Sequence, residues 1–260
     1  ARAKGADIRP VASPMEPVQI ARDNPDKPVV FFATGFETTT APVAAMLAEG
    51  VPDNLYVLLS GRLTWPAVAM LLESEEAGFH ALVAPGHVAT VMGAEEWKFV
   101  IDNFQMPAAI AGFTPESLLA AMYSTLRQTI EKRPFLDNCY AELVRPDGNL
   151  TAQKHMHKVL DVVDANWRGV GIIPASGFAL NEAYRQHDAR IKFPGHADDA
   201  RRRAGQMPPG CDCARVVLGK IYPNECRLYG KACTPRNPVG PCMVSDEGAC
   251  RIWWAGGIRE

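Results

Sequence analysis

The sequence has no long apolar run and no large excess of charge of either sign, and both absences limit what the protein can be. No window of the 260 residues approaches the roughly 18 consecutive apolar residues that a membrane-spanning helix needs. The pattern of a secretory signal peptide, a basic segment followed by an apolar core, is also missing. A net charge of −2 gives no field that would attract nucleic acid or an anionic membrane. We therefore expect no membrane span and no nucleic-acid partner.

Common nucleotide and metalloprotease motifs are absent as well. The chain contains no GxxxxGK[ST], GxGxxG or HExxH sequence, so nucleotide binding and zincin chemistry have no support. The HMH sequence at 155–157 is a weak metal site, because side chains two residues apart on a helix point to different faces.

Cysteine is scarce in the first 210 residues, where only Cys139 occurs, and is concentrated in the rest of the chain. The other six cysteines are Cys211, Cys213, Cys226, Cys233, Cys242 and Cys250. Without a secretory signal, metal or redox chemistry explains such a cluster better than a disulfide framework does. Residues 205–250 are rich in Gly and Pro, so burial of apolar groups offsets little of their conformational entropy. We expect the cysteines to supply the missing stabilisation.

Four of these cysteines form a widely spaced set that could surround one inorganic centre. The set is Cys213, Cys226, Cys233 and Cys250. Four thiolates suit either zinc or an iron–sulfur cluster. Zinc ribbons usually supply their ligands as two C-x2-C pairs, and the chain has none. Single, well-separated cysteines favour a [4Fe–4S] cluster over zinc, although spacing excludes neither Cys211 nor Cys242 as a ligand.

The first 130 residues alternate short apolar runs with helical patterns. The runs lie at 8–13, 29–36, 55–60, 81–86 and 108–113, and the helical patterns at 15–24, 40–50, 65–76 and 94–104. Nearly continuous apolar runs are typical of strands covered on both faces, as in a parallel sheet. This alternation predicts an α/β fold with a doubly wound, mostly parallel sheet. Further along the chain, we expect a helix at 149–164 and a strand at 169–177.

One helix is clearly indicated within residues 114–134. Thr114 suits the N-cap, Pro115 suits the first helical position, and Pro134 ends the helix. Apolar residues recur every four positions on one face, at Leu118, Met122, Leu126 and Ile130. This spacing is the pattern of an amphipathic helix.

The GFETTT sequence at 35–40 directly follows one of the predicted strands. This position is the carboxyl end of a strand, where α/β sheets form their ligand-binding crevices. Glu37 places a carboxylate between the end of the strand and the start of the next helix. The simpler explanation is that this carboxylate favours the positive N-terminus of a helix, and a functional role is the alternative.

A second turn, in the PGHVATVMG sequence at 85–93, also follows a predicted strand. We expect His87 to be exposed at the tip of this turn. Because parallel strands end on one side of a sheet, His87 should share a rim with Glu37. A single histidine on a turn is usually only solvated, but a histidine beside a carboxylate can donate or accept protons near neutral pH.

Two acidic residues, Asp246 and Glu247, lie shortly before Cys250. The simpler explanation is that they form a turn. The alternative is that Glu247 moves protons near a bound cluster, where a low dielectric shifts the pKa of an acid.

These motifs together resemble the HypD family of hydrogenase maturation factors. The matching stretches are GADIRPVASPMEP (5–17), GFETTT (35–40), PGHVATVMG (85–93), AGFTP (111–115), GKIYPNEC (219–226), YGKACTP (229–235) and SDEGAC (245–250). Each stretch alone is weak, but the combination is specific and covers nearly the whole chain. The resemblance implies a cytoplasmic scaffold with redox capacity that assembles the Fe(CN)2CO unit of [NiFe]-hydrogenases.

The resemblance also implies a site and partners. By the family pattern, the ligands of one [4Fe–4S] cluster fall on Cys213, Cys226, Cys233 and Cys250. The cleft in which the iron unit is assembled would be lined by Glu37, Thr38 and His87. The implied partners are a HypC-like small chaperone, a HypE-like cyanide donor, and iron that carries cyanide and CO.

The sequence departs from the family pattern in two places. It has no counterpart of the amino-terminal part, which carries a Cys-Gly-Gly-His motif and a Cys-Pro-x-Cys pair, and Gly61 stands where the family usually has His. We therefore expect a fragment or a truncated relative.

We expect this chain to have three parts. They are an α/β domain at 1–134, the remainder of a second α/β domain with a connection at 135–204, and a cysteine-rich [4Fe–4S] lobe at 205–260. Two other functions fit the same residues, namely a stand-alone iron–sulfur oxidoreductase and a zinc-stabilised binding module. Whether the chain is itself an enzyme stays open.

Overall fold

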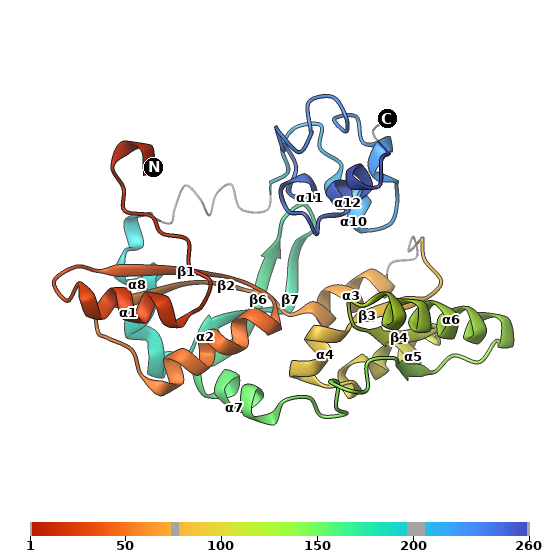
Figure 1. Ribbon diagram of the computed structural model, residues 1–260, viewed down its shortest axis with the longest axis horizontal. Helices are drawn as coiled ribbons and strands as arrows, with labels where there is room; N and C mark the ends of the chain where they lie inside the picture. The colour runs from red at the N-terminus through yellow and green to blue at the C-terminus, as the bar shows by residue number, and fades with distance from the viewer. Residues whose placement is uncertain (1, 74–77, 197–205, 259–260) are drawn as a thin grey trace.

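The structure, a computed structural model, describes residues 2–73, 78–196 and 206–258 (Figure 1). Its sheets are a parallel pair, β1 (Val29–Gly35) and β2 (Leu55–Gly61); a parallel triplet, β3 (Leu82–Pro85), β4 (Ala108–Ala111) and β5 (Leu136–Asn138); and an antiparallel hairpin, β6 (Leu160–Trp167) and β7 (Gly171–Leu180). The predicted α/β class with parallel strands is confirmed. The parallel strands, however, belong to two sheets and not to one.

Helices connect and cover these strands. The longer ones are α1 (Met15–Asp23), α2 (Glu37–Glu49), α3 (Thr64–Glu73), α4 (Gly86–Met92), α5 (Phe99–Phe104), α6 (Pro115–Glu131), α7 (Leu150–Val159) and α12 (Ala249–Ala255). The short ones are η1 (Arg2–Lys4), η2 (Glu95–Lys98), η3 (Glu182–His187), α8 (Ala189–Lys192), η4 (Pro194–His196), α10 (Cys213–Val217), η5 (Pro223–Glu225) and α11 (Pro241–Val244).

The first core lies around the β1–β2 pair. The two strands run in step, from Val29 opposite Leu55 to Gly35 opposite Gly61. Helices α1 and α2 cover them, and residues from α7, β6 and β7, far along the chain, complete the same buried cluster. Figure 1 shows α7 beneath α2, so the chain returns to this core after passing through a second one.

The second core lies around the β3–β4–β5 sheet. All four residues of the central strand β4 are buried, because β3 and β5 pair with it on either side. Trp97 of η2 and Val100 of α5 are fully buried in this cluster, and they pack with residues of α4 and β4. The two cores together explain why the apolar runs are short and nearly continuous.

The β6–β7 hairpin connects the first core to the cysteine-rich segment (Figure 1). Gly169, at the tip of the hairpin, has a φ of +81° that favours glycine. A Cβ atom on this residue would lie 2.7 Å from Cγ of Met207 and 3.1 Å from Cβ of Ala214. Arg168 adds a hydrogen bond from Nε to the Gln206 carbonyl oxygen at 3.3 Å. The tip therefore packs closely on the cysteine-rich segment.

Three of the predicted elements differ in the structure. No strand forms at 8–13, which is an extended segment beside β1. The predicted helix at 94–104 is divided into η2 and α5. The predicted helix at 149–164 ends at Val159, and the residues that follow form β6 because they pair with β7. That pairing forms a hairpin around residues 168–170, which helical periodicity does not reveal.

Helix α6 begins as predicted, but the face that packs against the sheet is not the one that carries the predicted apolar stripe. The Thr114 hydroxyl accepts a hydrogen bond from the Ser117 N–H at 3.3 Å, and Pro115 is the first helical residue. The predicted apolar stripe is exposed, with Leu126 63% and Ile130 81% accessible. The buried side consists of Ala121, Ser117, Ser124, Thr125 and Gln128. The small Ala121 packs against the alanines of β4, which lets the helix approach the sheet closely on this side.

Candidate functional site

The cysteines of the last segment gather in one buried cluster. The buried ones are Cys213, Cys226, Cys233, Cys242 and Cys250. They come from separate pieces of chain, namely the start of α10, the end of η5, an isolated bridge with Tyr229, α11 and α12. None of them is in a disulfide, and Cys211 packs against the cluster from its edge. The structure thus brings together all four predicted ligands and adds Cys242.

Three of the sulfurs interact directly. The sulfur of Cys242 forms hydrogen bonds with the thiols of Cys213 and Cys250, which lower the pKa of Cys242 to about 4. The hydrogen bond with Cys242 raises the pKa of Cys213, and a hydrogen bond with Cys213, followed by the one with Cys242, raises the pKa of Cys250. Burial raises the pKa of the neighbouring Cys211 to about 12. Three of the five buried sulfurs therefore lie within hydrogen-bonding reach of one another.

The backbone runs very close to these sulfurs. A Cβ atom on Gly240 would lie 2.4 Å from the sulfur of Cys211 and 2.6 Å from that of Cys213. The Val239 N–H donates a hydrogen bond to the sulfur of Cys233 at 3.4 Å. Backbone donors of this kind set the potential of iron–sulfur clusters when they point at the ligating sulfurs.

The residues of this cluster have the donor chemistry of a metal centre. Within residues 2–73, 78–196 and 206–258, no group of three or more His, Cys, Asp or Glu side chains is arranged as a site for a single metal ion. The donor set nevertheless consists of free, buried thiols, the ligands that iron–sulfur clusters and zinc prefer. Five buried thiols exceed the four that either centre needs. The cluster therefore fits such a centre in donor chemistry and in burial.

The hairpin also connects the cysteine cluster to the GFETTT turn. The rings of Phe36, directly before Glu37, and Trp167, in β6, have centroids 6.0 Å apart. Past the tip of the hairpin, Met207 packs against the buried cysteines. The hairpin thus contacts Phe36 at the end of β1 through Trp167, and its tip at Gly169 packs against Met207 beside the cysteines.

Glu37 is fully buried at the start of α2. Its Oε1 accepts a hydrogen bond from the Thr64 N–H at 2.6 Å, and its Oε2 accepts one from the Thr64 hydroxyl at 2.8 Å. Burial raises the pKa of Glu37, and these hydrogen bonds partly oppose that shift. The carboxylate therefore lies at the N-termini of two helices, because Glu37 is the first residue of α2 and its side chain accepts hydrogen bonds from Thr64 at the start of α3. Thr38 is half-buried beside it.

Glu96 is a residue that the sequence analysis missed. Burial, followed by the negative charge of Glu37, raises the pKa of Glu96 to about 8. Its Oε2 and the indole Nε1 of the adjacent Trp97 are buried and have no hydrogen-bond partner among the described residues. The sequence around it, GAEEWK, matches no functional motif, so only the fold reveals that this carboxyl lies near Glu37.

Replacing Glu96 with glutamine should change how stability depends on pH. The folded pKa of about 8 lies above the ordinary 4.5, so the folded state retains a proton that the unfolded state loses between these values. The free energy of unfolding therefore falls as pH rises from about 4.5 to about 8. Glu96→Gln should remove this loss and stabilise the protein at pH 8.5 by roughly 1–3 kcal/mol, with little effect at pH 5.

Urea unfolding at both pH values measures this effect. Glu95→Gln is the matched control, because Glu95 is adjacent and exposed. Equal pH dependence in the wild type and the Glu96→Gln variant would show that Glu96 ionises normally.

His87 is exposed, as predicted, on the first turn of α4. Its ring lies 4.6 Å from that of Phe113 and 6.2 Å from that of Tyr140, centroid to centroid. The prediction that His87 and Glu37 share one sheet rim is wrong, because β1 and β3 belong to different sheets. Among the described contacts none joins the two side chains, since Glu37 is turned towards Thr64.

Glu247 lies in an exposed turn at the edge of the cysteine cluster. Its N–H donates a hydrogen bond to the Ser245 hydroxyl at 3.2 Å, while Asp246 accepts one from Nε of Arg251 at 2.9 Å. This geometry is that of the simpler, turn-forming explanation. A role for Glu247 in proton movement stays a prediction.

The helices of the described ranges include none with the length and apolar character needed to span a bilayer.

The similarity to known proteins extends over both the segment that contains Glu37 and the cysteine-rich segment. The HypD family model, described as "Hydrogenase formation hypA family", matches residues 1–257. The hydrogenase maturation factor HypD2 of Bradyrhizobium diazoefficiens is 38% identical, over 99% of this chain and 69% of its own. HypD of Rhodobacter capsulatus is 38% identical, over 100% of this chain and 70% of its own. HypD of Escherichia coli is 37% identical, over 98% of this chain and 68% of its own.

Proposed function

The chain belongs to the HypD family, and from this premise we propose that it is a hydrogenase maturation protein whose cysteine-rich lobe holds one [4Fe–4S] cluster. The observation that carries this proposal is the burial of five free cysteines from separate segments around one point. Four thiolates hold a cubane cluster, and such a cluster would supply a store for one electron.

We assign the cluster ligands to Cys213, Cys226, Cys233 and Cys250, following the family pattern. Cys242 is the fifth sulfur of the same cluster and the one alternative ligand that the burial supports. The Val239 N–H and the close approach of Gly240 would hold the sulfurs in place and limit access of water.

The iron that carries cyanide and CO would be the substrate of this scaffold. We propose that this unit is assembled in a cleft bordered by Thr38 and His87, with the carboxylate of Glu37 buried beside Thr38. The buried carboxyls of Glu37 and Glu96 lie in the same region, and the hairpin contact between Phe36 and Trp167 connects it to the lobe. This arrangement would place carboxyls that can hold a proton near the end of β1, and a cluster that can store an electron in the cysteine-rich lobe.

The resemblance to the HypD family implies other proteins as partners in maturation. We propose a HypC-like small chaperone and a HypE-like cyanide donor as partners, and the cytoplasm as the location. We also propose the division at 204, because the described cysteine core draws on residues between Met207 and Trp254. The predicted division at 134 does not agree with the fold, because β5 pairs with β4 across it and residues of α7, β6 and β7 complete the first core.

A chimera tests this function. Residues 1–260 replace the matching region of E. coli HypD, and the chimera is expressed in E. coli lacking its own HypD. We expect hydrogenase activity to return with the chimera and to be lost again with Cys226→Ser. A folded, iron-containing chimera that restores no activity would refute the proposed function while leaving the cluster assignment intact.

A further inference from the structure

The side of α6 that points away from the sheet is apolar and exposed. The helix buries its small and polar residues, so the large side chains of the predicted stripe face solvent. Figure 1 shows α6 on the outside of the second core, at the end of the molecule opposite α1 and α8. We call this surface the α6 face, and its large apolar residues are Phe113, Leu118, Leu119, Met122, Tyr123, Leu126 and Ile130.

The residues of the α6 face form one continuous surface. Side chains three and four positions apart on a helix are neighbours. Four residues with this spacing, each between 54% and 68% exposed, form the middle of the face, namely Leu119, Met122, Tyr123 and Leu126. Single exposed apolar residues are ordinary on a protein surface, whereas a contiguous group marks an interaction site.

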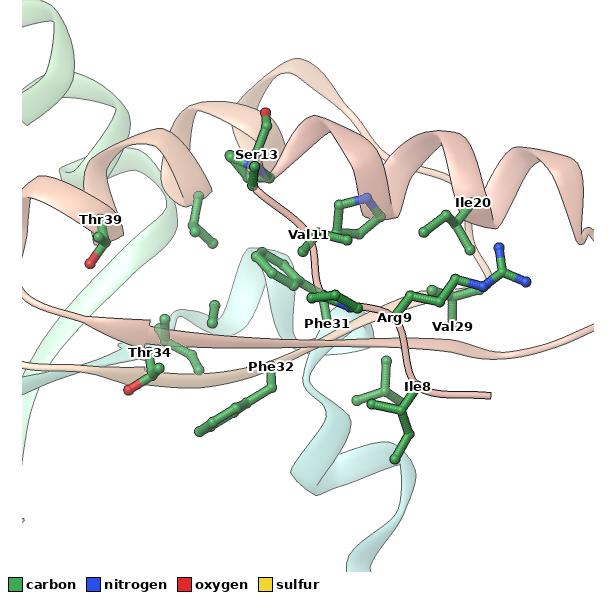
Figure 2. Close-up of a pocket in the computed structure, with 18 of the residues that line it drawn as sticks. Ile8, Arg9, Val11, Ser13, Ile20, Val29, Phe31, Phe32, Thr34 and Thr39 are labelled. Carbon is green, nitrogen blue, oxygen red and sulfur yellow. The ribbon is translucent and has the colours of Figure 1, made fainter. Parts of the chain in front are cut away.

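The exposed apolar residues of β1 are arranged differently. Phe32 is 60% exposed, but it lies beside a cavity of about 820 Å³ that β1 forms with the segment containing Ile8 and Val11. Figure 2 shows Phe31 and Phe32 on opposite sides of the strand, with Ile8 on the side of Phe32. Those residues border a hollow between two segments of this chain. The α6 face is the outer surface of one helix, and its exposure shows that no described segment covers it.

Charged residues border the α6 face on one flank. Glu116 and Arg127 are eleven positions apart, which is close to three helical turns, so they lie on the same flank of α6. Both are exposed. Within residues 2–73, 78–196 and 206–258, Glu116 is in no ion pair, and Arg127 has only the carboxylate of Glu131 at 3.8 Å. This flank therefore carries an acidic group near the start of α6 and a basic group nearer its end.

We propose that the α6 face binds the α6 face of a second copy of the chain, with the two helices antiparallel. In a pair with two-fold symmetry, each flank meets the same flank of the other copy. An axis midway between positions 121 and 122 places Glu116 of each copy level with Arg127 of the other, and Phe113 level with Ile130, because both pairs of positions are centred there. A parallel pair would instead place like charges opposite each other, so the charges select the antiparallel arrangement.

Burial of apolar surface would supply most of the affinity. Each copy would remove seven large side chains from water, and such burial contributes roughly 25 cal/mol per Å². The ion pairs between Glu116 and Arg127 lie at the rim, where exposed pairs add little affinity but determine orientation.

The pairing would also bring the second copy close to His87, because the ring of Phe113 lies 4.6 Å from that of His87, centroid to centroid. The pairing itself depends on α6 alone. It can therefore hold or fail independently of the proposed function.

Sedimentation equilibrium of residues 1–260, purified without oxygen, tests the pairing. We expect a dimer of twice the 28.3 kDa chain mass that dissociates on dilution. Leu126→Glu should raise the dissociation constant about a hundredfold, because it places a carboxylate at the centre of both buried faces. Leu150→Glu is the matched control, because Leu150 is 66% exposed at the start of α7, and this variant should dimerise like the wild type. Thermal unfolding checks that each variant is folded.

Charge reversal tests the antiparallel arrangement. Glu116→Arg and Arg127→Glu should each weaken the dimer by about three- to tenfold, since each opposes like charges across the pair twice. The double variant restores opposite charges, so its dissociation constant should return close to that of the wild type. A structural effect on each monomer would instead accumulate in the double variant.

Three results would overturn the inference. One is a monomer at every concentration up to about 0.2 mM, which would leave the α6 face to a different kind of partner. Another is an equal effect of Leu126→Glu and Leu150→Glu, which would place the dimer contact elsewhere. The last is a double charge variant that dimerises no better than the single variants.

Discussion

Replacing Cys233 with serine is expected to remove the iron–sulfur cluster and to unfold the cysteine-rich segment while leaving the two α/β cores intact. Cys233 is buried at the centre of the cluster, and its sulfur accepts a hydrogen bond from the Val239 N–H. Among the described residues, the hydrophobic core of this segment consists largely of the cysteines themselves, with Val216, Tyr229 and Met243 buried beside them. Binding of the metal centre is therefore a large part of the folding free energy of the segment.

The effect is measured by iron and sulfide analysis of protein purified without oxygen, combined with hydrogen exchange along the chain. Iron should fall from about four per chain to near zero. Exchange should become fast across 206–258 and stay slow in β2 and β4. Cys139→Ser is the control, because Cys139 lies outside the cysteine-rich segment and packs beside the alanines of β4. Equal loss of exchange protection over the whole chain would contradict the prediction that the cysteine-rich segment unfolds while the two α/β cores stay folded.

Glu37→Ala is expected to cause the second large effect, on stability. The substitution leaves the buried Thr64 N–H and hydroxyl without their carboxylate partner and creates a cavity where a fully buried side chain was. We expect a loss of about 2–4 kcal/mol in the free energy of unfolding. Glu37→Gln should cost less, because its amide oxygen can still accept the hydrogen bond from the Thr64 N–H. Urea unfolding of both variants measures the difference.

The same residue also tests the cleft. In the chimera, Glu37→Gln should retain its full iron content but support little hydrogenase maturation, because the carboxyl is replaced by a group that cannot take up or release a proton. Thr114→Ala, which removes only the cap of α6, is the control for a small loss of stability. Unchanged maturation in the Glu37→Gln variant would show that Glu37 has only a structural role, as the acceptor of the Thr64 hydrogen bonds at the N-terminus of α3.

Local patterns in the sequence predicted much of the fold. The bounds of β1, β2, β3 and β4 follow from apolar runs that end at Gly or Pro, and the start of α6 follows from Thr114 and Pro115. These signals are local, because each depends on residues within a few positions of one another.

What the sequence did not predict depends on contacts between distant residues. The division of the parallel strands into two sheets and the packing of α7, β6 and β7 against the first core are both long-range. The orientation of α6 reversed because β4 presents alanines, against which the small Ala121 packs better than Leu126.

The candidate site shows the same limit. The cysteine cluster was predictable, because six cysteines in a short Gly- and Pro-rich segment are unusual whatever the fold. Cys242 could be recognised as a full member of the cluster only from its burial and its contacts with Cys213 and Cys250. Glu96 carries no motif, and its raised pKa arises entirely from burial and from the charge of Glu37.

Analysis of the metal bound to residues 1–260 purified without oxygen tests the central claim most directly. The account predicts a brown protein with about four iron and four sulfide per chain, and slow exchange across 206–258 that is lost when the iron is removed. A colourless protein that contains zinc, or no metal, and whose cysteine-rich segment is equally well ordered would contradict it.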